Sequence, residues 1–458
     1  MLHTAQSRAG SARTEQAGAL VLTTLLGATL IGTLINNILN VPLREITRDF
    51  HAPLSGGVLV VSSFVLVLAA AMPLTGWVGD RFGRRRTLVA ALTLMTLAMV
   101  GAALAPSLPV LVAFRAVQGL ACAAIPPAVM AMLSAIFGPQ RRARTMSGWA
   151  AANGVGQAVG PPLGGLLADA SGWRAIFWVL APLTVVVLAA TAWFVPDDPR
   201  RPARLHWPGA ATLTIGSALL MTAATLVPQR SVPGWLDGAL AGLGFAFVGA
   251  FAVVSSRAVH PLIRTGSLME SRFLRSGVAA FAQMFCLAAV LVAVPLYVTG
   301  TLGCSTAVTG LLVFALPATM AVAAPGIGVL SERAGPRLVL RTGLVVLIGA
   351  ELAIGWYLDG GHRGLGVLVA TLVAVGGGVA LVQTPAATGA TRSPAGRSGA
   401  ALGLFNMLRF GGSALGAAWV AVVYPHGAFL LLFAGCAVMA AVGLLVSFAG
   451  PDPVATTA

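Results

Sequence analysis

Long apolar runs recur along the whole chain, and they limit the folds open to it. The chain has 458 residues, of which 57% are hydrophobic and only 9% are charged. A helical run of about 20 apolar residues crosses the ~30 Å hydrocarbon core of a bilayer. Backbone polar groups in hydrocarbon must be paired within the protein, so the runs predict membrane-spanning helices. A composition this apolar excludes a soluble protein of the same length.

The runs predict an all-α polytopic membrane protein with fourteen spans. Their approximate ranges are 17–40, 56–75, 88–106, 109–135, 147–168, 174–195, 208–228, 238–256, 277–299, 307–330, 338–358, 363–385, 399–424 and 427–448. An even number of spans places both ends of the chain on the same side of the membrane.

The basic residues predict which side that is. The chain carries 28 Lys and Arg residues, every one of them arginine, against 13 Asp and Glu residues. Most arginines lie in the N-terminal tail or in loops that follow even-numbered spans, which the positive-inside rule places in the cytoplasm. We therefore expect a multi-pass protein of the cell membrane (inner or plasma membrane) with cytoplasmic tails at 1–16 and 449–458. The net charge of +15 is an orientation signal rather than a sign of nucleic-acid binding.

The chain shows no sequence signature of an enzyme. Cys122, Cys286, Cys304 and Cys436 form no CxxC pair and have no metal-ligand spacing. HExxH, Walker and GxSxG motifs do not occur, which argues against metalloprotease, nucleotide-driven and esterase chemistry. We expect no metal and no cofactor.

The most distinctive charged stretch is the segment 76–86, which lies between two apolar runs. Its pattern is G-x-x-x-D-R-x-G-R-R, set by Gly76, Asp80, Arg81, Gly83 and Arg84. Charges this dense are excluded from hydrocarbon, so the segment is predicted to be a short loop at a membrane face. Arginines alone would be enough to orient the chain in the membrane. The glycines would also let two helices approach closely and let the loop turn tightly.

This pattern resembles the loop between the second and third spans of the major facilitator superfamily. A second copy, G-x-x-x-(D/E)-R-x-G-x-R, runs from Gly328 to Arg337 after the tenth span. The two copies predict two six-helix bundles, 17–195 and 277–448. The basic linker 196–276 would then carry two extra spans.

The predicted loop position of Asp80 suits a conformational latch better than a proton site, because the acid would pair with an arginine in one state and release it in another. A plain orientation anchor is the alternative. The residues assigned to the latch are Gly76, Asp80, Arg81, Gly83, Arg84, Glu332 and Arg333.

A second motif lies in the fifth span, with the pattern G-x-x-x-G-P-x-x-G-G. It consists of Gly156, Gly160, Pro161, Gly164 and Gly165. Small residues four apart form a groove for a neighbouring helix, and proline predicts a kink. The complete string resembles the antiporter motif of drug:proton antiporters and favours efflux over uptake, with simple helix packing as the alternative.

Two charged residues inside spans are candidates for proton coupling. Arg115, followed by Gln118, forms the string R-x-x-Q-G, which resembles the fourth-span motif whose arginine is associated with proton coupling. Gln118 lies one turn further along the helix, where we expect it to share the hydrogen bonding of Arg115. Reaching up to the outer interface is the alternative for Arg115. Glu351 is the one carboxylate inside a predicted span. The alternative to a proton-coupling role is that its side chain reaches the outer interface near Trp356 and Tyr357.

The first span departs from the resemblance. Fourteen-span drug antiporters often carry an aspartate nine residues before a proline, but here Thr33 stands nine residues before Pro42. Without this acid, neither proton binding in the first span nor selectivity for cationic substrates follows from the resemblance. Residues that line the substrate cavity, or else pack between helices, are predicted to be Asn36, Asn40, Trp149, Gln157, Phe281, Gln283 and Phe285. Arg409, with Asn406, is assigned to inner gating or to interface anchoring.

The resemblance implies a drug:proton antiporter that exports hydrophobic small molecules by alternating access, with the proton as coupling ion. We expect a monomer in the lipid bilayer, and no nucleic-acid partner. The scarcity of acids in the predicted cavity favours a neutral or weakly charged substrate. An importer or uniporter of a small metabolite is the first alternative, and a membrane receptor or lipid scramblase on a transporter scaffold is the second.

Overall fold

The computed structural model describes residues 2–52, 54–198, 204–227, 233–362 and 364–450. These residues form helices joined by short connections, and no strand occurs among them. The side chains of residues 2–15 and of a few others, including Asn40, lie outside the described part, as do residues 199–203 of the linker and 451–458 of the tail.

The first half of the chain forms one helical bundle. Its helices are α1 (Leu2–Asn37), α2 (Leu43–Asp49), α3 (Leu54–Phe82), α4 (Arg84–Ala103), α5 (Leu108–Ala123), α6 (Ile125–Ile136), α7 (Arg142–Ser171) and α8 (Arg174–Phe194). Helix α1 packs on α7 and α8, α3 on α5, and α4 on α8. The predicted fourth span is divided at Ala124 into α5 and α6.

The second half forms a matching bundle, preceded by a helical pair. The pair is α9 (Trp207–Leu226) and α10 (Gly234–Arg257), and the short α11 (Thr265–Leu268) follows it. The bundle consists of α12 (Ser271–Gly300), α13 (Thr306–Ala334), α14 (Pro336–Asp359), α15 (Leu365–Arg392), α16 (Gly399–Val423) and α17 (Phe429–Val446).

Helices of membrane-spanning length account for nearly all of the described chain. Thirteen helical segments of the described chain are long and apolar enough to cross a membrane, with α5 and α6 together counted as one of them. The predicted fifth span, 147–168, lies within α7, which has 30 residues but is not among the thirteen. Glycine, proline and amide side chains lower its hydropathy, and such a composition suits a helix enclosed by other helices rather than by lipid.

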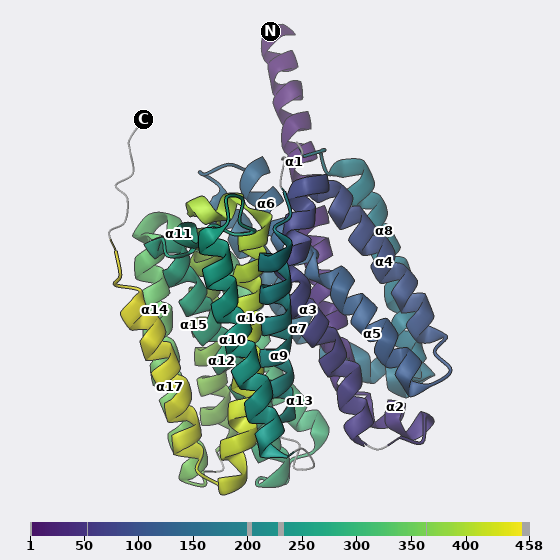
Figure 1. The fold of residues 1–458 in the computed structure, drawn as a ribbon, viewed down its shortest axis with the longest axis vertical. Helices are drawn as coiled ribbons and strands as arrows, with labels where there is room; N and C mark the ends of the chain where they lie inside the picture. Colours follow the sequence, from purple (N-terminus) through teal and green to yellow (C-terminus); the bar gives the residue numbers. More distant parts are fainter. Residues whose placement is uncertain (1, 53, 199–203, 228–232, 363, 451–458) are drawn as a thin grey trace.

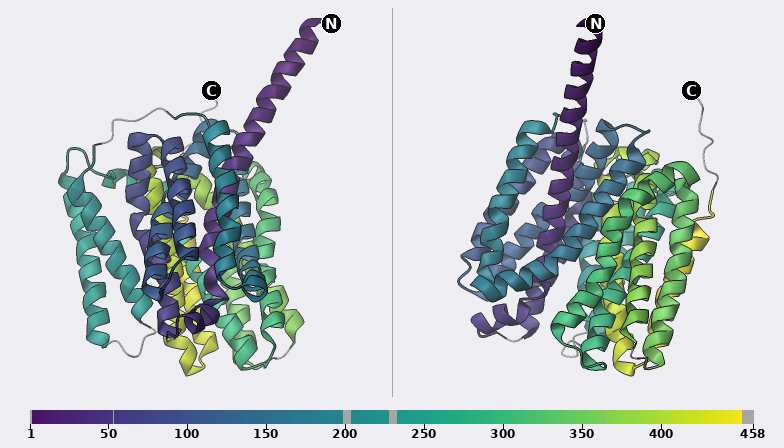
Figure 2. Two further views of the ribbon diagram at one scale, coloured as in Figure 1. Left: turned by 90° about the vertical axis from the view of Figure 1, so that its right-hand side faces the viewer. Right: turned by 180° about the vertical axis from the view of Figure 1, so that it is seen from behind.

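The two bundles stand side by side and meet along two pairs of helices (Figure 1). Helix α3 of the first bundle packs on α16 of the second, and α7 packs on α13. The α9–α10 pair lies to one side, where α9 contacts both α3 and α16 (Figure 2). The pair therefore covers the line along which the two bundles meet.

The beginning of α1 and the end of α17 lie at the same end of the molecule (Figure 1). This end also holds the junction of α3 with α4 and the junction of α13 with α14, and Arg337 of α14 donates to the carbonyl of Ser447 beyond α17. We call it the arginine-rich end, because the first junction carries Arg81, Arg84, Arg85 and Arg86 and the second carries Arg333, Arg337 and Arg341. The prediction that an even number of spans brings both ends together agrees with this arrangement.

The prediction of a loop over 76–86 is wrong. Helix α3 continues to Phe82 and α4 begins at Arg84, so Gly83 is the only residue between them. Gly83 has a φ of 98°, which glycine adopts without the steric cost that other residues have. The charged residues therefore project from helix ends. Gly335, with a φ of 86°, separates α13 from α14 in the same way.

At the opposite end, α2 is tied to the beginning of α8. Asp49 accepts hydrogen bonds from Arg174 Nη1 at 2.5 Å and from Trp173 Nε1 at 3.1 Å. These bonds, that from Arg174 foremost, hold the pKa of Asp49 below its ordinary value because they stabilise the charged carboxylate. Glu45 accepts from the backbone N–H of Trp173 at 3.1 Å.

Candidate functional site

The closest approach of the bundles is made through glycine. A Cβ on Gly76 of α3 would overlap the carbonyl group of Gly399, the first residue of α16. One turn deeper, a Cβ on Gly403 would overlap the carbonyl of Met72. Glycine at these positions lets the two helices touch backbone to backbone, as small residues do in membrane helix pairs.

Asp80 joins the end of α3 to the beginning of α16. Its Oδ2 accepts a hydrogen bond from the backbone N–H of Gly399 at 2.6 Å, and its Oδ1 lies 3.3 Å from Arg84 Nη2. Arg84 also donates to the carbonyl of Arg397 at 3.4 Å and pairs with Asp198 at 3.4 Å. A carboxylate at the start of a helix is stabilised by the free N–H groups and the helix dipole. We call this group of contacts the Asp80 clasp.

The second copy of the motif makes an equivalent contact between α13 and α7. A Cβ on Gly328 would lie 2.8 Å from the Cβ of Ser147, so glycine again permits a close approach. Glu332 Oε2 accepts from Arg144 Nε at 2.9 Å, which joins the end of α13 to the beginning of α7. We call this the Glu332 clasp. Arg81 and Arg333, the other predicted latch arginines, are exposed.

The glycines of the fifth-span motif face α1 within the first bundle. Cβ atoms on Gly156 and Gly160 would lie 2.7 Å from Thr33 and 3.1 Å from Asn37, and one on Gly164 would overlap the carbonyl of Ile38. A Cβ on Gly165, at the edge of this contact, would lie 3.3 Å from Val41. Helix α7 continues through Pro161 and Pro162 without interruption.

Helix α7 meets the second bundle through a glycine outside the motif. A Cβ on Gly154 would lie 2.9 Å from the backbone nitrogen of Ala321 in α13. Sequence reasoning missed this residue because the motif string begins at Gly156. The sequence did contain a signal: Gly154 lies two residues before Gly156 and therefore on another face of the same helix, where it can contact a different neighbour.

Arg115 is fully buried inside the first bundle, so it does not reach the outer interface. It donates to the carbonyls of Val60 at 3.1 Å and Ile35 at 3.3 Å, and to Gln118 Oε1 at 2.7 Å. The guanidinium also lies 4.3 Å from the ring centre of Phe64. The predicted hydrogen bond between Arg115 and Gln118 is confirmed. Arg115 thereby ties α5 to α1 and α3.

A buried polar cluster joins the two bundles, with residues from α16, α7 and α6. The guanidinium of Arg409 on α16 lies 4.8 Å from the ring centre of Trp149 on α7. Arg409 donates to Asn406 Oδ1 at 2.9 Å, and Asn406 Nδ2 lies 3.3 Å from the sulfur of Met130 on α6. All four side chains are buried. Trp149, a predicted cavity residue, thus lies where the two bundles meet.

Further polar groups lie beside this cluster on α1 and α7. Thr33, which replaces the expected acid, lies 3.2 Å from Asn153 Oδ1. The buried Oδ1 of Asn36 has no hydrogen-bond partner in the part of the chain that the structure describes. Gln157 is half-buried on α7. The side chain of Asn40 lies outside the described residues.

The predicted cavity residues of α12 lie where that helix packs on α16. Cβ atoms on Gly412 and Gly416 would overlap the carbonyls of Phe281 and Phe285, so the two backbones are in contact. Gln283 is fully buried, and neither polar atom of its amide has a partner among the described residues.

Glu351 lies within the second bundle and is fully buried, so it does not lie at the outer interface. Its neighbours are the thiols of Cys286 on α12 and Cys436 on α17. Neither carboxyl oxygen has a hydrogen-bond partner within the described ranges. Helix α14 packs on α12, α15 and α17.

Two helical bundles that meet along two equivalent helix pairs, with buried polar groups between them, define a membrane transporter. The sequence matches the model of the Major Facilitator Superfamily over residues 24–417 and 276–457. The chain belongs to this superfamily and is a multi-pass membrane transporter rather than an enzyme.

Relatives and solved structures agree with this assignment. The chain is 31% identical over 404 residues to the multidrug resistance protein Stp of Mycobacterium tuberculosis, covering 85% of this chain and 74% of that one. It is 31% identical over 420 residues to the drug efflux pump JefA of the same organism, covering 89% and 82%. The structure of the human organic anion transporter MFSD10 matches with a TM-score of 0.70 at 20% identity, covering 94% and 99%.

Proposed function

We propose that this protein exports hydrophobic small molecules by alternating access and that proton entry drives the export. The observation that carries the proposal is the paired clasp at one end of a two-bundle transporter, close to a buried polar centre. Drug efflux among the 31% identical relatives supports the direction of transport. The fifth-span glycine motif, packed tightly on α1, supports it further.

Alternating access requires the bundles to separate at one end while they close at the other. The cross-bundle contacts described above run from the arginine-rich end past the Trp149–Arg409 contact to the contact of Gly154 with Ala321. Breaking the Asp80 and Glu332 clasps would let the bundles rock about this contact. A transported molecule in the centre would then face the opposite side.

The centre favours hydrophobic compounds that carry little or no positive charge. Once the bundles separate, the buried Trp149 would offer a large aromatic surface, and Asn153, Asn406 and Thr33 would offer neutral polar groups. Arg409 is the charged group at this place, and its positive charge disfavours cationic compounds. Aromatic and neutral polar side chains together bind apolar molecules and orient them.

For proton coupling we assign the proton to Glu351 and a positioning role to Arg115 and Gln118. An unpaired carboxylate in an apolar bundle costs several kcal/mol, so a bound proton favours the closed packing around it. Loss of that proton would favour a packing that admits water near α12 and α14. Because α12 packs on α16, such a change reaches the bundle interface. Arg115 would keep the first bundle rigid as the two bundles move.

The test is proton movement in proteoliposomes that contain a pH-sensitive dye. A pH gradient is imposed and hydrophobic compounds are added, with the wild type, Glu351→Gln and Asp359→Asn compared. Asp359 is the matched control because it is an exposed carboxylate at the end of the same helix. We expect substrate-triggered proton flux that Glu351→Gln abolishes and Asp359→Asn retains.

Other results would contradict the proposal in distinct ways. Proton flux that survives Glu351→Gln would exclude Glu351 as the proton site. Substrate movement without proton flux would exclude antiport and favour a uniporter or importer. Movement of lipid that is independent of substrate and pH would favour a scramblase.

A further inference from the structure

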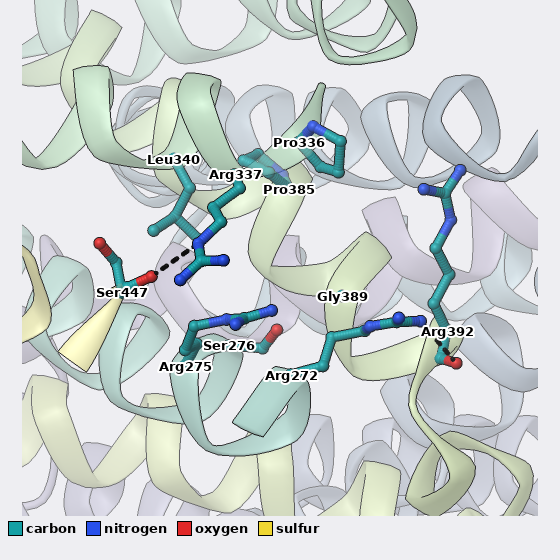
Figure 3. A pocket seen from close by; sticks show the side chains of 10 residues that line it. All are labelled: Arg272, Arg275, Ser276, Pro336, Arg337, Leu340, Pro385, Gly389, Arg392 and Ser447. Atoms are coloured by element: carbon teal, nitrogen blue, oxygen red, sulfur yellow. Dashed lines mark hydrogen bonds between the residues drawn. The ribbon is translucent and has the colours of Figure 1, made fainter. Parts of the chain in front are cut away.

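A cavity of about 320 Å³ opens in the second bundle at the arginine-rich end. Four arginines line it: Arg272 and Arg275 from α12, Arg337 from α14 and Arg392 from α15 (Figure 3). Among the described residues, no aspartate or glutamate lines this cavity. The lining is therefore strongly positive.

Two of these arginines are held rigidly by the chain that follows α17. Arg275 donates to the carbonyls of Ala449 at 2.7 Å and Gly450 at 3.2 Å. Arg337 donates to the carbonyls of Ser447 and Phe448, both at 2.9 Å. These carbonyls follow the last residue of α17, so the bonds tie the segment after α17 to α12 and α14. They also fix two guanidinium groups beside the cavity.

The other two arginines, Arg272 and Arg392, make fewer hydrogen bonds to the protein than Arg275 and Arg337. Arg272 donates to the backbone carbonyl of Arg392 at 3.4 Å, and the side chain of Arg392 is exposed. The positive charges of Arg272 and Arg392 repel each other, with Glu332 as an attractive partner of Arg392. Arg142, at the beginning of α7, is repelled by both, and its buried Nε has no partner in the described chain.

Like charges gathered this closely destabilise the protein unless an anion lies between them. Guanidinium groups bind phosphate oxygens through paired N–H donors, which makes arginine the residue best suited to phosphate. The volume lies at the lower end of the roughly 300–1,000 Å³ of ligand pockets. Leu340, Pro336 and Pro385 supply an apolar wall beside the charged groups.

We propose that this cavity binds a phosphate group, carried by an anionic lipid headgroup or by free phosphate. Basic pockets between helices at a membrane face commonly hold lipid headgroups. The site is separate from the polar centre assigned to transport.

The experiment measures binding to the purified full-length protein in neutral detergent. Mixed micelles carry dioleoylphosphatidic acid, with dioleoylphosphatidylcholine as the zwitterionic comparison, and a separate arm uses sodium phosphate. Binding is followed by thermal unfolding and by native mass spectrometry of retained lipid. The variant is Arg272→Gln with Arg392→Gln, and the control is Arg257→Gln with Arg264→Gln, two exposed arginines outside the cavity.

We expect phosphatidic acid to stabilise the wild type and the control. It should bind the cavity variant at least tenfold more weakly, because that variant lacks two guanidinium groups that would bond the phosphate. Arg392→Gln alone tests the site with little risk to folding because Arg392 is exposed. Stabilisation by sodium phosphate as well would identify free phosphate as a ligand, and stabilisation by the lipid alone would identify the headgroup. No preference over phosphatidylcholine, or an equal loss in the control variant, would overturn the proposal.

Discussion

At the scale of single residues, backbone carbonyls of neighbouring helices can stabilise a buried charge in this protein. Arg115 shows this most clearly, because two carbonyls and one amide oxygen surround its guanidinium. Helix carbonyls normally bond within their own helix, so accepting a further bond from Arg115 binds α1 and α3 to α5. Arg409 is stabilised differently, by the aromatic face of Trp149 and by one side-chain amide oxygen, that of Asn406.

Arg115→Lys tests the geometry separately from the charge. Lysine keeps the positive charge but lacks the planar fork that reaches three acceptors. Each lost bond to a buried charged group costs about 1.5–3 kcal/mol, so we expect at least a tenfold loss of transport and lower thermal stability. Transport in proteoliposomes and unfolding in detergent measure the two effects. Arg86→Lys, at an exposed arginine, should change neither, and full activity of Arg115→Lys would remove the fork from the mechanism.

The Asp49 carboxylate predicts a pH-dependent contribution to stability. Its pKa is lowered in the folded protein by the hydrogen bond from Arg174. The stabilisation is therefore complete above the unfolded value of about 3.9 and is lost as the pH falls through the lower folded value. Because the pair is partly exposed, we expect about 1 kcal/mol or less. The difference in melting temperature between wild type and Asp49→Asn should be present at neutral pH and vanish in strong acid. A difference that persists in acid would contradict this explanation.

At the scale of helices, glycine decides which pairs approach closely. Helices α3 and α16 touch through Gly76, Gly399 and Gly403, while α7 uses one set of glycines toward α1 and Gly154 toward α13. Interfaces made of small residues have few interlocking side chains. Their helices can separate and rejoin without repacking large groups, which suits a transporter that alternates between two states.

Gly76→Ala should disfavour the closed arginine-rich end. Its new Cβ would overlap the backbone of Gly399, which cannot move aside as a side chain can. Gly79→Ala is the matched control on the same helix, because its Cβ would meet only Arg84 Cγ at an ordinary 3.7 Å. We expect faster hydrogen exchange over residues 399–405 and slower transport in Gly76→Ala alone. Equal behaviour of the two variants would contradict the close-contact role.

At the scale of the whole molecule, the two bundles contact each other through two equivalent pairs of helix ends. The end of α3 binds the beginning of α16, and the end of α13 binds the beginning of α7, each through an acid of the repeated motif. Each bundle thus supplies one acid and receives one. The α9–α10 pair covers the seam between α3 and α16 from one side.

In the mechanism proposed above, opening the arginine-rich end requires both clasps to break, so their combined effect on transport should exceed that of either alone. Asp80→Asn should lower kcat more than it raises KM, because the carboxylate holds a conformation rather than the substrate. Glu332→Gln should have a smaller effect, since the side chain of Arg144 in this pair is largely exposed and such pairs contribute about 0–1 kcal/mol. Steady-state transport of the two variants and of the double variant measures this. A rise in KM with kcat unchanged would count against a latch.

The family, the helical class and the two-bundle repeat followed from the sequence, because hydrocarbon requires long apolar helices and the charged motif occurs twice. The pairing of Arg115 with Gln118 also followed, since residues three apart share a helix face. The tertiary structure decided what crosses between helices: the Asp80 and Glu332 clasps, the contact of Arg409 with Trp149, and the burial of Glu351. It also replaced the expected loop at 76–86 by helix, with Gly83 as the only break. Local patterns specify which segments are helical and apolar, whereas contacts between residues hundreds of positions apart depend on how the finished helices pack.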